Sequence, residues 1–169
     1  YYNNKGKLIS LKNYKDGKPW GKWQLWDDDA EWLQSESDYK GEKNYTLRIY
    51  YDNGKLSEEH TYKEGKEEGS QKYYQREGYL SKELLKENGE LVLYKTYHSN
   101  GKLYSEMPYK DGKKNGKSVI YYPNGKITEE GTYKNNRKEG VWKYYNQAGR
   151  LTSEETYDHD NVVKTVNYN

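Results

Sequence analysis

Apolar residues recur along this chain with a period of about 24 residues, far longer than the period of a helix or a strand. Glycine marks the repeat most clearly, because five glycines are spaced 24, 23, 24 and 24 residues apart. Two further steps of 24 towards the N-terminus reach Ala30 and Gly6. The predicted anchors of seven copies are Gly6, Ala30, Gly54, Gly78, Gly101, Gly125 and Gly149. We therefore expect residues 1–169 to form a single repeat domain.

Other residue types keep the same spacing from the anchors. An aromatic residue lies four positions before each anchor: Tyr2, Trp26, Tyr50, Tyr74, Tyr97, Tyr121 and Tyr145. Leu or Ile follows two positions after six anchors, and Trp32 takes this place in the second copy. Glutamate lies five positions after the last five anchors: Glu59, Glu83, Glu106, Glu130 and Glu154. The odd spacing between Leu and Glu puts them on opposite faces of a strand, so the simplest role for Glu is to pair with Lys or Tyr on a neighbouring strand.

Each copy is predicted to be two short strands with a turn after each. Residues 126–134 and 140–145 typify the two strands, which are rich in β-branched and aromatic residues. Asn-Gly and Asp-Gly turns separate them, and such turns favour antiparallel hairpins. Residues 81–89 could also be read as a helix, but the repeat positions hold there and favour a strand. The predicted fold is all-β, an elongated single antiparallel sheet of about seven stacked hairpins.

The composition favours a thin sheet over a thick core. The mean hydropathy is −1.48, and the chain has 22 Tyr and 5 Trp but no Phe. Tyr and Trp rings carry a polar group, which suits half-exposed faces. We expect the rings to form ladders along the sheet.

The segment DGKKNGKS at residues 111–118 resembles a phosphate-binding loop. Gly112 and Gly116 are both repeat positions, however, and three residues separate them where a P-loop has four. The residues that follow are strand-like rather than helical. The segment is interpreted as a turn of the repeat and not as a nucleotide site.

The remaining chemistry gives no sign of an enzyme. The net charge is +2 with both signs mixed along the chain, and Cys is absent, which argues against nucleic acid or an anionic membrane as a partner and against thiol chemistry. No apolar run reaches the length of a membrane span. His60, His98 and His159 fall at different repeat positions. The acidic run 27–31 and the residues around His159 are read as solvated turns, so neither metal nor cofactor is expected.

The pattern resembles the MORN repeat in its bacterial variant form. The matching residues are YYDNGKL at 50–56, with near matches at 97–103 and 121–127, and the Gly-x-Trp starts at Gly21 and Gly140. The resemblance implies an antiparallel sheet of hairpins and a role in interaction rather than catalysis. Bacterial proteins of this kind are often labelled antitoxins, and others look exported or surface-bound. The expected location is therefore exported or at the cell surface, or cytoplasmic if the protein is a true antitoxin.

Three functions are carried forward from the sequence. The first is binding of a protein partner, the second is binding of carbohydrate or cell wall, and the third is binding of phospholipid. End-to-end self-association is also expected, because terminal strands leave edges unpaired. The aromatic candidates for contact are Trp20, Trp23, Trp26, Trp32, Tyr50, Tyr74, Tyr97, Tyr121, Trp142 and Tyr145. The aliphatic candidates are Leu84, Leu85, Leu91 and Leu93.

Overall fold

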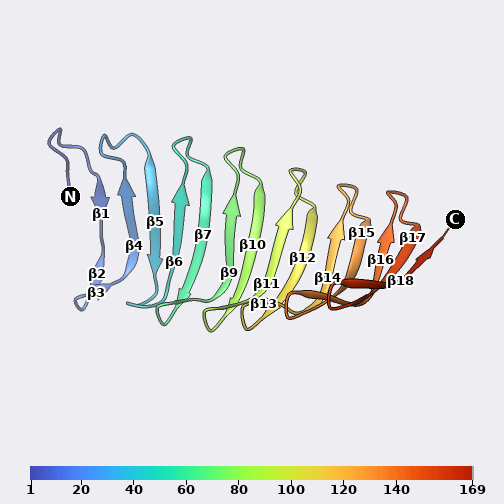
Figure 1. The fold of residues 1–169 in the computed structure, drawn as a ribbon. Coiled ribbons are helices and arrows are strands. Elements are labelled where there is room, and N and C mark those ends of the chain that lie inside the picture. The colour runs from blue at the N-terminus through green and yellow to red at the C-terminus, as the bar shows by residue number, and fades with distance from the viewer. Residues whose placement is uncertain (169) are drawn as a thin grey trace. The chain divides into compact units, whose positions relative to one another are not determined.

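The computed structural model describes residues 1–168, which contain eighteen β-strands and no helix (Figure 1). Strand pairing assigns sixteen strands to one antiparallel sheet, and β2 (Tyr14–Lys15) and β3 (Lys18–Pro19) form a separate two-stranded ribbon. The predicted all-β class and antiparallel hairpins are confirmed. Residues 81–89, for which a helix was the alternative, lie in β10 (Leu80–Glu87) and the turn that follows. The described part of the chain has no helix that could serve as a membrane span.

The chain divides into two compact units. The first unit comprises residues 1–80 and 86–89. Its main sheet runs in the order β1, β4, β5, β6, β7 and β9, with β8 paired to β7. The bounds are β1 (Ser10–Leu11), β4 (Gly21–Trp26), β5 (Leu33–Tyr39), β6 (Tyr45–Tyr50), β7 (Leu56–Lys63), β8 (Lys66–Glu67) and β9 (Gly69–Tyr74).

The second unit comprises residues 81–85 and the chain from Glu90 onward. Its strands run in the order β11, β12, β14, β15, β16, β17 and β18, with β13 paired to β12. The bounds are β11 (Glu90–Tyr97), β12 (Leu103–Lys110), β13 (Lys113–Lys114), β14 (Gly116–Tyr121), β15 (Ile127–Lys134), β16 (Arg137–Tyr145), β17 (Leu151–Asp158) and β18 (Asn161–Asn167).

The seven anchor positions occupy one type of turn. Every anchor has a positive φ, between 56° at Ala30 and 97° at Gly78. The anchor N–H donates to the carbonyl three residues earlier, as Gly54 does to Tyr51 at 2.9 Å and Gly125 to Tyr122 at 2.8 Å. Glycine takes this left-handed conformation without steric cost, whereas a residue with a Cβ does not. The glycine period in the sequence is therefore a period of hairpin turns.

The Asn and Lys of the Asn-Gly-Lys turns join neighbouring turns within each unit. The Asn53 side chain accepts the N–H of Lys55 at 3.1 Å and donates to the carbonyl of Arg76 at 3.1 Å. The Lys55 ammonium donates to the carbonyl of Glu77 at 2.7 Å. Asn100 and Lys102, and then Asn124 and Lys126, make the equivalent bonds to the next turn in the second unit. These bonds satisfy carbonyl groups that would otherwise face only solvent at the edge of the sheet.

The repeated glutamates lie on one face of each unit, which we call the charged face. In the first unit, Arg48 Nε lies 2.8 Å from Glu59 and Arg48 also contacts Glu36 at 3.5 Å. In the second unit, Glu130 lies 2.7 Å from Lys117 and accepts a hydrogen bond from the hydroxyl of Tyr145, also at 2.7 Å. Burial and this hydrogen bond raise the pKa of Tyr145 to about 12. The predicted pairing of the glutamates with Lys and Tyr on neighbouring strands is confirmed.

The buried interior is small. Trp142 is the single hydrophobic side chain that is buried in the described part of the chain, with 1% of its surface exposed. Its indole lies on Gly131, where an added Cβ would come within 2.1 Å of the ring. Tyr133 and Tyr157 contact the indole edge-on, at centroid distances of 5.0 and 6.2 Å. The Lys138 ammonium covers the ring at 4.0 Å from its centroid. Ring contacts across the strands thus replace a layered core, as the composition predicted.

We predict that Gly54→Ala destabilises the protein by about 1 kcal/mol. No atom lies within 4 Å of the position that the new Cβ would take, so the cost comes from the left-handed backbone alone. Ala30→Gly removes the same strain and is expected to be neutral or stabilising. Urea unfolding of both variants checks the pair, and equal effects of the two substitutions would contradict it.

We also predict that Gly131→Ala destabilises the second unit by about 1–3 kcal/mol, because its Cβ would overlap the indole of Trp142. Adding Trp142→Leu should recover part of this loss in the double variant. Thermal unfolding of the two single variants and the double variant forms the test. An additive double variant would show that the two residues are not coupled.

Candidate functional site

A row of aromatic rings crosses the first unit on the face opposite the repeated glutamates. The row consists of Tyr14, Trp23, Tyr39, Tyr45 and Tyr62, and successive ring centroids are 5.0, 4.9, 4.8 and 4.5 Å apart. Strand register sets this spacing, because Tyr39 pairs with Tyr45 and Tyr45 with Tyr62. We call these five residues the aromatic row.

The N-terminal end of the aromatic row is the open end. Tyr14 is 58% exposed, and Trp20 beside β3 is 46% exposed. Lysine ammonium groups lie over the rings there, Lys12 at 5.1 Å from the Trp23 centroid and Lys15 at 5.1 Å from that of Trp20. The indole N–H of Trp23 donates to the carbonyl of Asn13 at 2.6 Å. This end of the row presents amphipathic rings that are already fixed in place.

A shallow hollow of about 230 Å³ adjoins Trp23 on the same face. Three serines line it, Ser10, Ser35 and Ser37. Leu25, Leu11 and Trp23 supply apolar surface at its walls. The small serine side chains on β1 and β5 leave this depression between larger neighbours. The hollow combines hydroxyl groups with an aromatic wall.

The structure places the other candidate residues in different surroundings. Trp26 and Trp32 are half-buried at the second anchor turn, where Asp27 accepts the backbone N–H of Trp32 at 2.9 Å. The backbone N–H groups of Asp29 and Glu31 also donate to Asp27. These hydrogen bonds, with that from Trp32 as the largest influence, lower the pKa of Asp27. Tyr50, Tyr74, Tyr97, Tyr121 and Tyr145 are half-buried, and the Tyr97 hydroxyl donates to Glu83 at 2.8 Å. Trp142 offers no ring surface to a ligand, since it is buried.

The four leucine candidates are half-buried in the second unit. Leu85 and Leu93 line a hollow of about 90 Å³ together with Glu83 and Lys95. The leucines therefore present partial side-chain surface, in a space smaller than the hollow beside Trp23. The four leucines belong to the second unit, whereas the tryptophan candidates other than Trp142 belong to the first.

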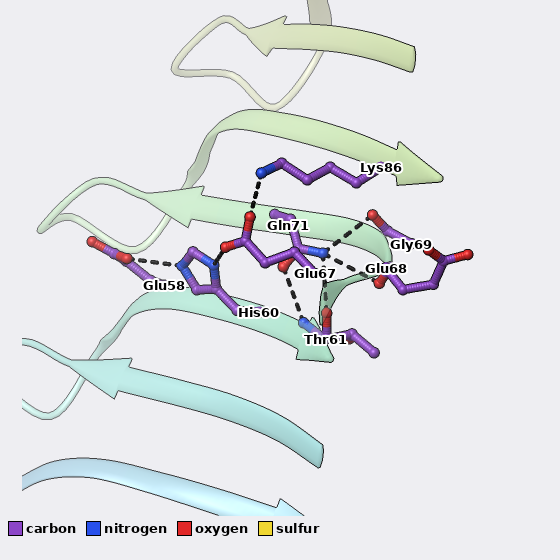
Figure 2. Close-up of polar contacts among 8 residues, drawn as sticks. All are labelled: Glu58, His60, Thr61, Glu67, Glu68, Gly69, Gln71 and Lys86. Carbon is purple, nitrogen blue, oxygen red and sulfur yellow. Dashed lines mark hydrogen bonds and ion pairs between the residues drawn. The ribbon is translucent and has the colours of Figure 1, made fainter. Parts of the chain in front are cut away.

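A buried polar cluster in the first unit was not singled out from the sequence (Figure 2). His60 on β7 is 7% exposed, and its ring lies between two carboxylates. The Nδ1 atom is 3.2 Å from Glu67, and the Nε2 atom is 2.9 Å from Glu58. Lys86 forms an ion pair with Glu67 from the opposite side. The cluster thus alternates acidic and basic groups across β7, β8 and β10.

Gln71 anchors the backbone beside this cluster. It has no exposed surface, and its side-chain oxygen accepts the N–H of Thr61 at 3.0 Å. Its amide nitrogen donates to the carbonyls of Thr61, Glu68 and Gly69 at 3.2–3.3 Å. Gln71 follows Gly69 by two residues, as Trp142 follows Gly140. The sequence did contain a signal for this cluster: Gln71 stands at a repeat position where other copies have Trp, which indicates a polar contact there in place of an aromatic one.

The contacts of this cluster indicate a structural role. The His60 ring packs edge-on against Tyr73, with centroids 5.2 Å apart, and exposes too little surface to meet a substrate. The hydrogen bond from Lys86, supported by His60, holds the pKa of Glu67 below its usual value although burial opposes this. Glu67 therefore stays ionised and paired in the folded protein.

Glu139, Asp158 and His159 offer ligand atoms within 4.8 Å of one another at a turn of the second unit. Asp158 and His159 are exposed, and the N–H of His159 donates to Glu139 at 3.3 Å. The contacts are those of a solvated hairpin turn, in line with the interpretation from the sequence.

We predict that Glu67→Gln costs about 1 kcal/mol of stability at pH 7. Because the folded-state pKa of Glu67 is lowered from 4.5, its contribution is present above that pH and is lost as the pH falls through the folded-state pKa. The difference in unfolding free energy between wild type and variant should therefore shrink between pH 5 and pH 3. Urea unfolding across this range measures it. A difference that stays constant with pH would contradict the assignment.

Comparison with known protein families matches this geometry. The model for the MORN repeat variant matches residues 46–64, 91–111, 114–135 and 138–159. Each matched segment holds two strands and the anchor turn between them, at Gly54, Gly101, Gly125 and Gly149. Proteins with MORN repeats are commonly interaction modules and are generally non-enzymatic. No curated protein matches the chain. The repeated turns, the strand order and these four matches together show that the chain belongs to the MORN repeat variant family.

Proposed function

We propose that this protein is a non-enzymatic binding module that uses the open end of the aromatic row to contact a protein partner. The observation that carries the proposal is the exposure of Tyr14 and Trp20 beside rings that are already ordered. Ordered Tyr and Trp side chains lose little entropy on binding, and they are enriched among residues that dominate binding energy.

Several features of the first unit support this proposal. Leu25 and Leu11 are also exposed on the walls of the neighbouring hollow. The hollow can accept one side chain of a partner, while the flanking rings provide apolar contact around it. Lys12 and Lys15 lie over rings and add polar groups at the rim. This combination of an apolar centre and a polar rim is typical of protein interfaces.

Binding of carbohydrate is the second candidate function, and the hollow is the observation that favours it. Three serine hydroxyls beside an indole suit the hydroxyl groups and the apolar face of a sugar ring. The volume of about 230 Å³ is sufficient for a single ring. A glycan array with the intact protein separates this candidate from the first, because a module for proteins alone would retain no glycan.

Antitoxin activity is one specific form of the proposed protein binding. It requires a toxin as the partner, and such pairs are encoded side by side. A toxin-like reading frame beside the gene would favour this form. An exported binding module would instead be expected to associate with cell-surface material.

The test of the proposed function starts from capture of partners by the intact chain in cells that produce it, followed by purification of the captured protein. We predict that Tyr14→Ala/Trp20→Ala weakens binding of that protein by tenfold or more in calorimetry, because two central aromatic contacts are lost. Tyr104→Ala serves as the matched control, since this exposed ring lies in the second unit. Unchanged affinity of the double variant, with circular dichroism showing an intact fold, would overturn the proposal.

A further inference from the structure

A hollow of about 300 Å³ in the second unit is surrounded by cations from two successive turns. Lys113 begins β13, directly after the turn between β12 and β13, and Lys134 and Arg137 flank the turn between β15 and β16. Lys134 and Arg137 are direct partners across their hairpin. Asn135, Glu139 and His159 complete the lining.

These three cations differ from the lysines of the charged face in the same unit. On the charged face, Lys95, Lys117 and Lys143 each contact a glutamate, at 3.8, 2.7 and 3.6 Å. Among the described residues, Lys113, Lys134 and Arg137 form neither an ion pair nor a side-chain hydrogen bond with one another or with any acidic group. The lining of the hollow thus carries three cationic side chains and a single carboxylate, that of Glu139.

The acidic group of the hollow is already engaged. Glu139 accepts the N–H of His159 at 3.3 Å and lies 3.9 Å from the Nδ1 atom of the same residue. Two further lysines of this edge are also directed elsewhere, because Lys114 lies over the ring of Tyr133 and Lys138 over that of Trp142. Lys113, Lys134 and Arg137 are therefore the cations in the lining of the hollow, and none of them forms an ion pair within the described part of the chain.

The comparable hollow of the first unit does not have this imbalance. It is lined by Lys63 and Lys66 together with Glu64, Glu68 and Asn88, so its formal charges cancel. The excess of positive charge is a property of the hollow in the second unit and not of every turn of the repeat.

We propose that the hollow lined by Lys113, Lys134 and Arg137 binds an extended acidic segment of the protein partner. This inference rests on the proposed function and adds a second contact surface and the charge of the partner. Turns of successive hairpins are two strands apart, which is about 10 Å. Carboxylates two or four residues apart project from the same face of an extended chain, and at about 3.3 Å per residue they are about 7 or 13 Å apart, which brackets this separation. One carboxylate would meet Lys113, and the other would meet Lys134 and Arg137, whose guanidinium binds carboxylates with two parallel hydrogen bonds.

The arrangement favours a narrow chain over a flat anionic surface. Asp111 lies in the turn before Lys113, Asp158 and Asp160 lie at the neighbouring turn between β17 and β18, and all three are exposed. A membrane would meet these carboxylates together with the cations, whereas an extended peptide can follow the cations alone. A single phosphate ion is too small to span two turns that are about 10 Å apart.

The test measures binding of a fluorescein-labelled peptide of six Glu-Gly repeats to the full chain by fluorescence anisotropy at low salt. We expect the triple variant Lys113→Gln/Lys134→Gln/Arg137→Gln to bind at least tenfold more weakly. The matched control Lys40→Gln/Lys43→Gln/Lys63→Gln removes the same charge from turns of the first unit and should change the affinity by less than about threefold. A peptide of six Gln-Gly repeats should not bind.

Other outcomes overturn the inference. Equal loss in both triple variants would indicate attraction by net charge alone. Displacement of the peptide by equimolar inorganic phosphate would indicate a point-anion site. Co-flotation with phosphatidylserine vesicles that depends on the three cations, without peptide binding, would indicate a membrane contact.

The two proposals fail separately. Tyr14→Ala/Trp20→Ala should leave binding of the acidic peptide unchanged, because these rings lie in the first unit. A captured partner whose affinity depends on the aromatic row but not on the three cations would support the proposed function and contradict this inference. A captured partner whose affinity depends on the three cations but not on the aromatic row would contradict the proposed function and support the acidic contact.

Discussion

Within each unit, the sheet must hold its strands together without a second layer packed on either face. A typical domain buries aliphatic side chains between layers, and that burial supplies most of its stability. Here the described side chains bury a single large hydrophobic residue, Trp142. Contacts between adjacent strands must therefore do most of the stabilising, and each of the observed features strengthens such contacts. The contacts differ between the two faces: ion pairs join the strands on one face, and aromatic ring contacts join them on the other.

On the charged face of the first unit, alternating signs on successive strands give a continuous row of ion pairs, and in the second unit they give separate pairs. Arg48 contacts glutamates on both of its neighbouring strands. Single exposed ion pairs contribute little, but a shared side chain is already ordered when its second pair forms. On the opposite face, the centroids of successive rings in the aromatic row lie 4.5–5.0 Å apart. The rings at the end of the row are exposed, so the contacts that stabilise the sheet also leave aromatic surface open to solvent.

The turns at the two ends of the strands differ in how strongly their residues are constrained. At the Asn-Gly-Lys turns, the Asn and Lys side chains hydrogen-bond to the neighbouring turn, and the Gly adopts a positive φ. Substitution of any of the three residues would therefore disturb the turn. The turns at the opposite ends of the strands vary more. Their charges cancel around the hollow beside Lys66, and they do not cancel around the hollow beside Lys134. Variation of this kind on a constant frame allows one repeat to present different surfaces.

The sequence by itself determined the turns, the antiparallel strands and the pairing of the repeated glutamates, because each depends on residues close in the chain or one repeat apart. Positive φ at the anchors follows directly from the glycine period, and even Ala30 adopts it. Only the tertiary structure decided which side chains are covered. Trp23 and Trp142 both follow a glycine by two residues, yet Trp142 is buried on Gly131 while Trp23 faces a lysine and a hollow. The polar cluster of His60 depends in the same way on Glu67 and Lys86, from two other strands. Burial is set by the size and charge of the residue on the adjacent strand, and a pattern read along one strand does not contain that information.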